Sequence, residues 1–87
     1  MKKNTRKFNY DCILDLHGQN LDEALMNIEK ALYSGKYNSI MIIHGHGEGI
    51  LRNGIRKHLA ASEYIKGTIY GEDMNIPGDS GVTVIYM

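Results

Sequence analysis

A run of four apolar residues that opens into a glycine-rich loop constrains this chain more than any other feature. Residues 40–43 (IMII) are apolar and three of them are β-branched, a composition typical of a buried strand. Glycine then recurs at 45, 47 and 49, and an amphipathic segment begins at Ile50. Glycine permits positive φ values and a close approach of the backbone to a ligand. The stretch therefore predicts a strand, a loop and a helix in succession.

The loop is a candidate anion site because of the helix that follows it. A helix that begins near Gly49 or Ile50 leaves its first amide groups without partners inside the helix, and the positive end of the helix dipole lies behind them. Phosphate is the anion most often bound in this way. The glycine spacing matches neither the dinucleotide-binding motif nor the P-loop, so a simple strand-to-helix turn is an equal alternative for the loop alone. The predicted phosphate-binding residues are His44, Gly45, His46, Gly47, Gly49 and Arg52.

A second motif, LDLHG at residues 14–18, ends another predicted strand. Alternation of side chains along that strand places Asp15 and His17 together on the face opposite the core. An imidazole with a reference pKa of about 6.5 transfers protons near neutrality, and a carboxylate can orient the ring or hold a metal. Asp15 and His17 are therefore a candidate acid–base pair, while simple hydrogen bonding to loop amides is the alternative for this motif alone. Because both motifs end strands of one βαβ unit, we expect them to lie close together.

Periodicity in the rest of the chain predicts a single small domain. Asn20 is expected to cap a helix of about fourteen residues with one apolar stripe, and Gly35 to end it. A second helix is predicted from about residue 50 to 61, and residues 66–70 and 82–86 are predicted strands. The order β-α-β-α-β-β predicts an α+β two-layer sandwich, with two helices on a four-stranded mixed sheet whose first two strands are parallel.

The second helix contains an internal glycine and a group of cations. Gly54 costs about 1 kcal/mol relative to alanine at such a position, and close packing would explain it. The helix is expected to direct Ile50 towards the core and Arg52, Arg56 and Lys57 towards solvent. The polar stretch 71–81, between the last two strands, is predicted either as a mobile flap at the site or as a disordered connection.

Composition excludes several classes of protein. The single cysteine, Cys12, excludes an internal disulfide and indicates a reducing compartment. No apolar run is long enough to span a bilayer, and the basic start leads to no signal-peptide core, so we expect a soluble cytoplasmic protein without a membrane partner. We expect residues 1–10 to be a basic flexible arm or the end of a linker, and residues 11–87 to be the folded domain. The net charge of zero does not favour nucleic-acid binding, although the arm supplies Lys2, Lys3, Arg6 and Lys7.

Three segments, LDLHG at 14–18, IHGHGEGILR at 43–52 and GDSGVTV at 78–84, resemble the small MutS-related (Smr) domain. The resemblance implies a fold similar to the C-terminal domain of translation initiation factor 3. It also implies a nicking endonuclease that acts on DNA or RNA or, alternatively, a non-catalytic nucleic-acid-binding module, possibly the C-terminal domain of a MutS-like protein. Catalytic importance is thereby assigned to Asp15 and His17, and substrate binding to Gly45, Gly47 and Gly49.

Two positions depart from the family pattern. Many relatives carry lysine where this chain has His46 and a small hydroxyl residue where it has Glu48, so the local field for a polyanion is weaker here.

The cofactor is left open by the sequence, because two histidines two residues apart lack the ligands of a complete zinc site. We expect Mg²⁺ or Mn²⁺ to be required for cleavage or to stimulate it. The sequence thus predicts an endonuclease that hydrolyses phosphodiester bonds in DNA or RNA.

Overall fold

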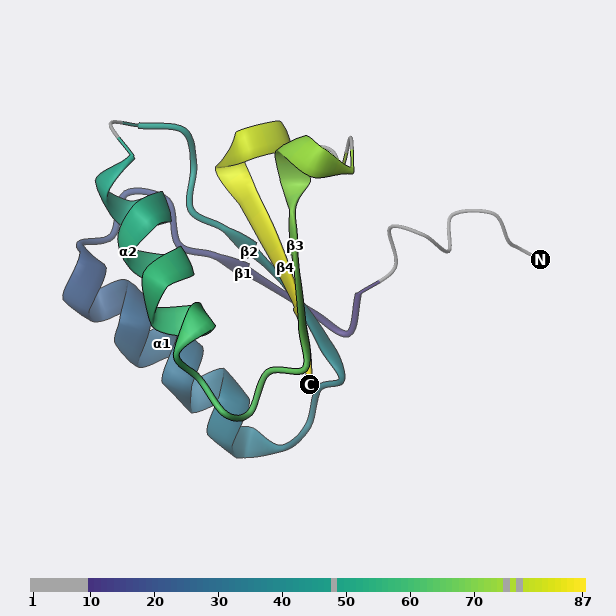
Figure 1. Ribbon diagram of the computed structural model, residues 1–87. Helices are drawn as coiled ribbons and strands as arrows, with labels where there is room; N and C mark the ends of the chain where they lie inside the picture. Colours follow the sequence, from purple (N-terminus) through teal and green to yellow (C-terminus); the bar gives the residue numbers. More distant parts are fainter. Residues whose placement is uncertain (1–9, 48, 75, 77) are drawn as a thin grey trace.

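The chain forms the predicted sandwich of two helices on a four-stranded mixed sheet (Figure 1). The computed structural model describes residues 10–47, 49–74, 76 and 78–87. The sheet order is β1-β2-β4-β3, in which β1 and β2 are parallel and the other two pairs are antiparallel. The elements are β1 (Cys12–Asp15), α1 (Leu21–Ser34), β2 (Ser39–Ile43), α2 (Ile50–Ala60), β3 (Gly67–Tyr70) and β4 (Val82–Tyr86). The predicted order of elements and the parallel first pair are confirmed. The basic arm, apart from Tyr10, lies outside the described residues, and none of the helices described is long and apolar enough to cross a membrane.

Helix α1 begins and ends at the residues predicted to cap it. The side chain of Asn20 accepts a hydrogen bond from the Glu23 amide at 2.8 Å, and the Glu23 carboxylate accepts one from the Asn20 amide at 3.2 Å. This reciprocal capping box satisfies donors at the N-terminus of α1 from within the helix itself. At the other end Gly35 adopts a left-handed φ of 68°, which allows its amide to donate to the carbonyl of Leu32.

Both helices pack on the same face of the sheet and form the main core there (Figure 1). Gly54 lies where α2 approaches α1: a Cβ at Gly54 would lie 2.6 and 2.7 Å from the two methyl carbons of Leu21. Close packing therefore explains a glycine inside α2. The fully buried side chains of this core include Ile28, Ile40, Ile42, Ile55 and Ile85.

The opposite face of the sheet carries a second, smaller core. Met41 and Val84 are buried there together with Ile76, which comes from the connection between β3 and β4. The described part of that connection contains two 3₁₀ turns, η2 (Gly71–Asp73) and η3 (Asp79–Gly81). Burial of Ile76 gives a physical reason why the described part of the connection is folded into turns, since this side chain anchors the connection to the sheet.

Two expectations for α2 are wrong. Ile50, expected to face the core, is 68% exposed because it is the first residue of the helix and lines an open pocket. Arg56, expected to face solvent, has only 12% of its side chain exposed because its guanidinium reaches across to β4 and η2. Lys57 is exposed, as predicted.

Candidate functional site

The two motifs meet beyond the C-terminal ends of β1 and β2. The amide of Leu16 donates to the carbonyl of Ile43 at 2.7 Å, which continues the parallel pairing past the end of β1. A Cβ at Gly45 would lie 3.2 Å from the Cβ of His17, so the glycine loop and the Asp–His motif are in contact. This contact agrees with the proximity expected from the parallel topology.

Asp15 and His17 form an exposed pair beside the loop. One carboxylate oxygen, Oδ1, is hydrogen-bonded to Nδ1 of the His17 ring and accepts from the His17 amide at 3.3 Å. The hydrogen bond from the ring is the main cause that lowers the pKa of Asp15 below its ordinary value. Since a carboxylate only accepts, Nδ1 donates this hydrogen bond, and in the neutral ring Nε2 is the nitrogen with a free lone pair. The pair thus has the orientation required of a carboxylate-supported general base.

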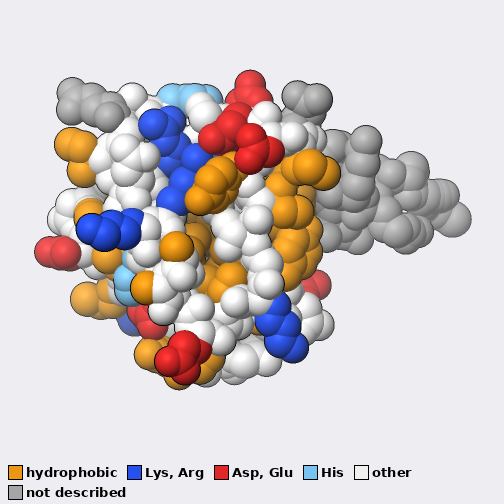
Figure 2. All heavy atoms as spheres, in the orientation of Figure 1, with side chains coloured by type: hydrophobic (Ala, Val, Ile, Leu, Met, Phe, Trp, Pro, Cys, Tyr) orange, Lys and Arg blue, Asp and Glu red, His pale blue; other side chains and the backbone are white. Residues whose placement is uncertain are grey.

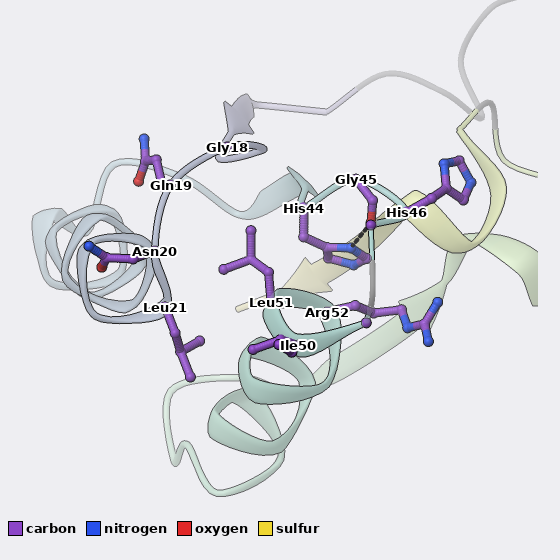
Figure 3. A pocket seen from close by; sticks show the side chains of 12 residues that line it. Gly18, Gln19, Asn20, Leu21, His44, Gly45, His46, Ile50, Leu51 and Arg52 are labelled. Carbon is purple, nitrogen blue, oxygen red and sulfur yellow. Dashed lines mark hydrogen bonds between the residues drawn. The ribbon is translucent and has the colours of Figure 1, made fainter.

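A pocket of 380 Å³ lies between the glycine loop and the starts of both helices (Figure 3). Residues 18–21, 44–47 and 49–52 line it. His44, Gly45, His46, Gly47, Gly49 and Arg52, the residues predicted to bind phosphate, are all among them. Asp15 and His17 border the loop but are not part of the lining. The predicted binding residues are therefore gathered around one cavity, with the candidate acid–base pair at its edge.

No side chain in the described part of the chain caps the N-terminus of α2. Gly49 is its N-cap residue with a left-handed φ of 87°, and the first backbone hydrogen bond of the helix runs from the Asn53 amide to Gly49 at 2.8 Å. Among the described residues, the amides of the first three helical positions, 50–52, have no acceptor. The guanidinium of Arg52 lies at the same place, with Nη2 3.1 Å from the position of a Cβ on Gly49. This end of the pocket therefore combines amides that have no acceptor among the described residues, a helix dipole and a cation, whereas α1 is capped by its own side chains.

The two loop histidines occupy different environments. His44 is 4% exposed, with Nδ1 3.1 Å from the Gly45 carbonyl and Nε2 2.9 Å from the hydroxyl of Thr83. Burial is the main cause that lowers the pKa of His44 below its ordinary value. His46 is exposed, and its ring lies 3.1 Å from the position of a Cβ on Gly81. Figure 3 shows the His44 ring turned towards Gly45 and His46 directed away from it.

The sequence did not single out the residues that surround His44. Arg56 donates to Thr83 at 2.8 Å and to both carboxylate oxygens of Glu72 at 2.9 Å, and its guanidinium lies 4.0 Å from the ring centroid of Tyr70. The hydrogen bonds from Arg56 are the main cause that lowers the pKa of Glu72 to about 2. Figure 2 shows basic and acidic side chains next to one another in the upper part of the view. Of these residues, only Thr83 could have been noticed in the sequence, because it belongs to the GDSGVTV segment that resembles the Smr domain.

A metal site is not assembled by the described residues. No group of three or more His, Cys, Asp or Glu side chains converges among residues 10–47, 49–74, 76 and 78–87. Glu48, the carboxylate closest in sequence to the loop histidines, lies outside these ranges.

The fold and the pocket define a class of small α+β domain that presents a glycine loop and an Asp–His pair at one end of a mixed sheet. The family model of the Smr domain matches residues 14–87, and the chain belongs to that family. The solved Smr domain of Thermus thermophilus MutS2 has the same fold, with a TM-score of 0.76 and 28% identity over 85% of this chain and 94% of that one.

Longer relatives share the same stretch. The Endonuclease MutS2 of Caldanaerobacter subterraneus subsp. tengcongensis is 42% identical over 78 residues, which cover 83% of this chain and 9% of that protein. The Endonuclease MutS2 of Lactobacillus johnsonii is 35% identical over 77 residues, which cover 85% of this chain and 10% of that protein. The chain therefore spans about a tenth of the length of these relatives.

Proposed function

We propose that this domain binds DNA or RNA through its glycine loop and the start of α2, and nicks the phosphodiester backbone with Asp15 and His17. The observation that carries the proposal is the N-terminus of α2, whose first amides have no acceptor among the described residues, with the Arg52 guanidinium against Gly49. Similarity to proteins named Endonuclease MutS2 supports the same class of activity.

Phosphate binding follows from the chemistry of the α2 N-terminus. Free amides at a helix start and the dipole behind them favour an anion, and Gly47 leaves the approach open because a Cβ there meets no atom within 4 Å. Arg52 adds a charge-assisted hydrogen bond, which is worth about 1.5–3 kcal/mol. Because these donors recognise phosphate rather than bases, binding is expected to show little sequence preference.

Cleavage uses the exposed nitrogen of His17. Nε2 accepts a proton from a water molecule as the water oxygen attacks phosphorus, and the bond from phosphorus to the leaving ester oxygen breaks. The imidazolium then returns a proton to the leaving oxygen. Asp15 holds the ring in the tautomer that leaves Nε2 free and stabilises the positive charge that develops. The loop amides and Arg52 stabilise negative charge on the non-bridging oxygens.

A divalent cation fits one feature of the pair. Mg²⁺ and Mn²⁺ prefer carboxylate ligands and keep several waters, so the second oxygen of Asp15, which makes no hydrogen bond in the described residues, is a suitable single ligand. A bound cation would supply a more acidic water. We expect chelation followed by dialysis to lower the nicking rate and Mg²⁺ or Mn²⁺ to restore it; full activity of the chelated protein would contradict this expectation.

The alternative is a module that binds nucleic acid without cutting it. It is favoured by the position of Asp15 and His17, which border the pocket without lining it and are more than half exposed. Supercoiled plasmid and structured RNA, each incubated with parent protein and with His17→Ala, separate the two functions. Nicking by the parent and its loss in His17→Ala support the endonuclease. Binding without nicking by the parent supports the alternative, and equal nicking by both proteins excludes His17 as the base.

Two matched pairs of variants test the binding surface by fluorescence anisotropy. Gly47 and Gly35 both have positive φ and open space for a Cβ, but Gly35 ends α1 away from the pocket. Gly47→Ala should therefore weaken binding and Gly35→Ala should not, although both strain the backbone. Arg52→Ala should weaken binding more than Lys57→Ala, which removes an exposed cation from the same helix. If the Gly47 and Arg52 variants fold and bind as the parent does, the pocket is not the phosphate site.

A further inference from the structure

A chain of buried and part-buried hydrogen bonds runs from α2 through β4 to the glycine loop. Nε of Arg56 donates to Oγ1 of Thr83 at 2.8 Å, and the same oxygen lies 2.9 Å from Nε2 of His44. Beyond the imidazole, Nδ1 lies 3.1 Å from the carbonyl oxygen of Gly45. Thr83 is fully buried and His44 nearly so, which limits the competition of water for these partners.

The two ends of the chain determine the direction of its first and last hydrogen bonds. A guanidinium only donates and a carbonyl only accepts. The Thr83 hydroxyl therefore accepts from Arg56, and Nδ1–H of His44 donates to Gly45. Burial lowers the pKa of His44 and so favours the neutral ring. In the neutral ring Nδ1 carries the only proton, and Nε2 accepts from the Thr83 hydroxyl.

The last residue of the chain, Gly45, is the point where the loop leaves the sheet. Its amide donates to the carbonyl of Gly81 at 3.0 Å, and its carbonyl accepts from His44. Its φ of 82° is in the left-handed region, and a Cβ on it would lie 3.2 Å from His17. The peptides on both sides of Gly45 are thus hydrogen-bonded, and His17 packs against this residue.

At the other end of the chain, Arg56 uses four of its five N–H donors within the described part of the protein. Its terminal nitrogens donate to both oxygens of Glu72 at 2.9 Å and to the carbonyl of Val82 at 3.1 Å. The Tyr70 ring lies 4.0 Å from the guanidinium carbon. These contacts occupy most of the N–H donors that a phosphate-binding arginine would offer to its ligand.

We propose that Arg56 and Thr83 are positioning residues that select the Nδ1–H tautomer of His44, and that His44 in this tautomer holds Gly45 and the loop in the form that receives phosphate. The identity of the ligand rests on the proposed function, whereas the geometry of the loop is a property of the free protein. Arg56 therefore affects binding without touching the nucleic acid.

Substitutions at Thr83 test the proposal without a change of charge. Thr83→Val keeps the shape and removes the hydroxyl, whereas Thr83→Ser keeps the hydroxyl. Nitrogen-15 NMR of the imidazole in the full free chain should show protonated Nδ1 for the parent and Thr83→Ser, and a mixture of tautomers for Thr83→Val. The Gly45 amide should exchange with solvent about tenfold faster or more in Thr83→Val. Thr68→Val, at an exposed threonine on β3, is the matched control and should change neither signal.

A second pair of variants tests Arg56 itself. Arg56→Met should reproduce the mixture of His44 tautomers, while Lys57→Met, which removes one exposed charge from the same helix, should not. Circular dichroism establishes that each variant is folded. An Arg56→Met protein that keeps the parent tautomer would remove Arg56 from the proposal.

The outcomes separate this proposal from the proposed function. A single Nδ1–H tautomer in Thr83→Val would overturn the positioning role, and so would a tautomer mixture without faster exchange of the Gly45 amide. If both free-protein signals change as expected and the parent binds nucleic acid, Thr83→Val should bind several-fold more weakly and Thr83→Ser as the parent does. If the signals change but the parent binds no nucleic acid, the positioning of the loop is supported and the proposed function fails.

Discussion

The substitution Gly54→Ala has two opposing effects on stability, each of known size. Alanine in place of glycine inside a helix gains about 1 kcal/mol of helix propensity. The new Cβ, however, would lie 2.6 and 2.7 Å from the two methyl carbons of Leu21 and 3.2 Å from its Cγ. Because both methyl carbons and Cγ of Leu21 are close to the new Cβ, the whole Leu21 side chain must move to relieve the contacts. Overpacking of this kind costs about 1–3 kcal/mol.

The expected net effect is a loss of about 1 kcal/mol in the free energy of unfolding, which lowers the melting temperature by about 4–8 °C for a domain of this size. In a Leu21→Ala background the methyl groups are absent. In that background only the gain in helix propensity remains, and Gly54→Ala should stabilise the protein by up to about 1 kcal/mol. The sign of the substitution should therefore reverse between the two backgrounds.

Urea unfolding followed by circular dichroism on the four proteins of this cycle measures the coupling directly. Leu21→Ala alone should cost less than the 2–5 kcal/mol typical of a fully buried leucine, because Leu21 is only half-buried. A stabilising effect of Gly54→Ala in the parent would refute the reasoning. Equal effects in both backgrounds would also refute it, since the contact with Leu21 would then play no part.

Three further predictions concern charges. The pKa of Asp15 should lie below its ordinary value in a carboxyl NMR titration and should rise in His17→Ala. Because folding lowers this pKa, Asp15 contributes to stability above its unfolded pKa, and the contribution is lost as the pH falls through its folded pKa. Glu72 should titrate near pH 2 and move towards 4.5 in Arg56→Met, so the stability that it contributes above pH 4.5 should disappear as the pH falls towards 2, and an unshifted titration would exclude the ion pair in solution. Deletion of residues 1–9 should weaken nucleic-acid binding and reduce its salt dependence while leaving the rate of cleavage at saturation unchanged; an identical salt slope would show that the arm contacts no phosphate.

Local chemistry was sufficient for most of the fold. The capping box at Asn20 and the left-handed Gly35 delimit α1 through bonds between residues close in sequence. Alternation that continues one residue beyond β1 places Leu16 in the core and Asp15 outside it. The parallel pairing of β1 and β2 follows from the helix that joins them. Contact between His17 and Gly45 then follows from topology, since both come after the ends of parallel neighbours.

Contacts between distant parts of the chain decided the rest. A helical wheel places Arg56 towards solvent, yet its partners Glu72 and Thr83 are 16 and 27 residues away in sequence and reach it only in the folded sheet. The pattern of the loop likewise treats His44 and His46 alike, whereas packing against Thr83 buries the first and leaves the second exposed. Periodicity and capping act over a few residues, so the sequence by itself determined the elements and their order. The partners of buried polar side chains depend on how those elements pack, and only the tertiary structure decided them.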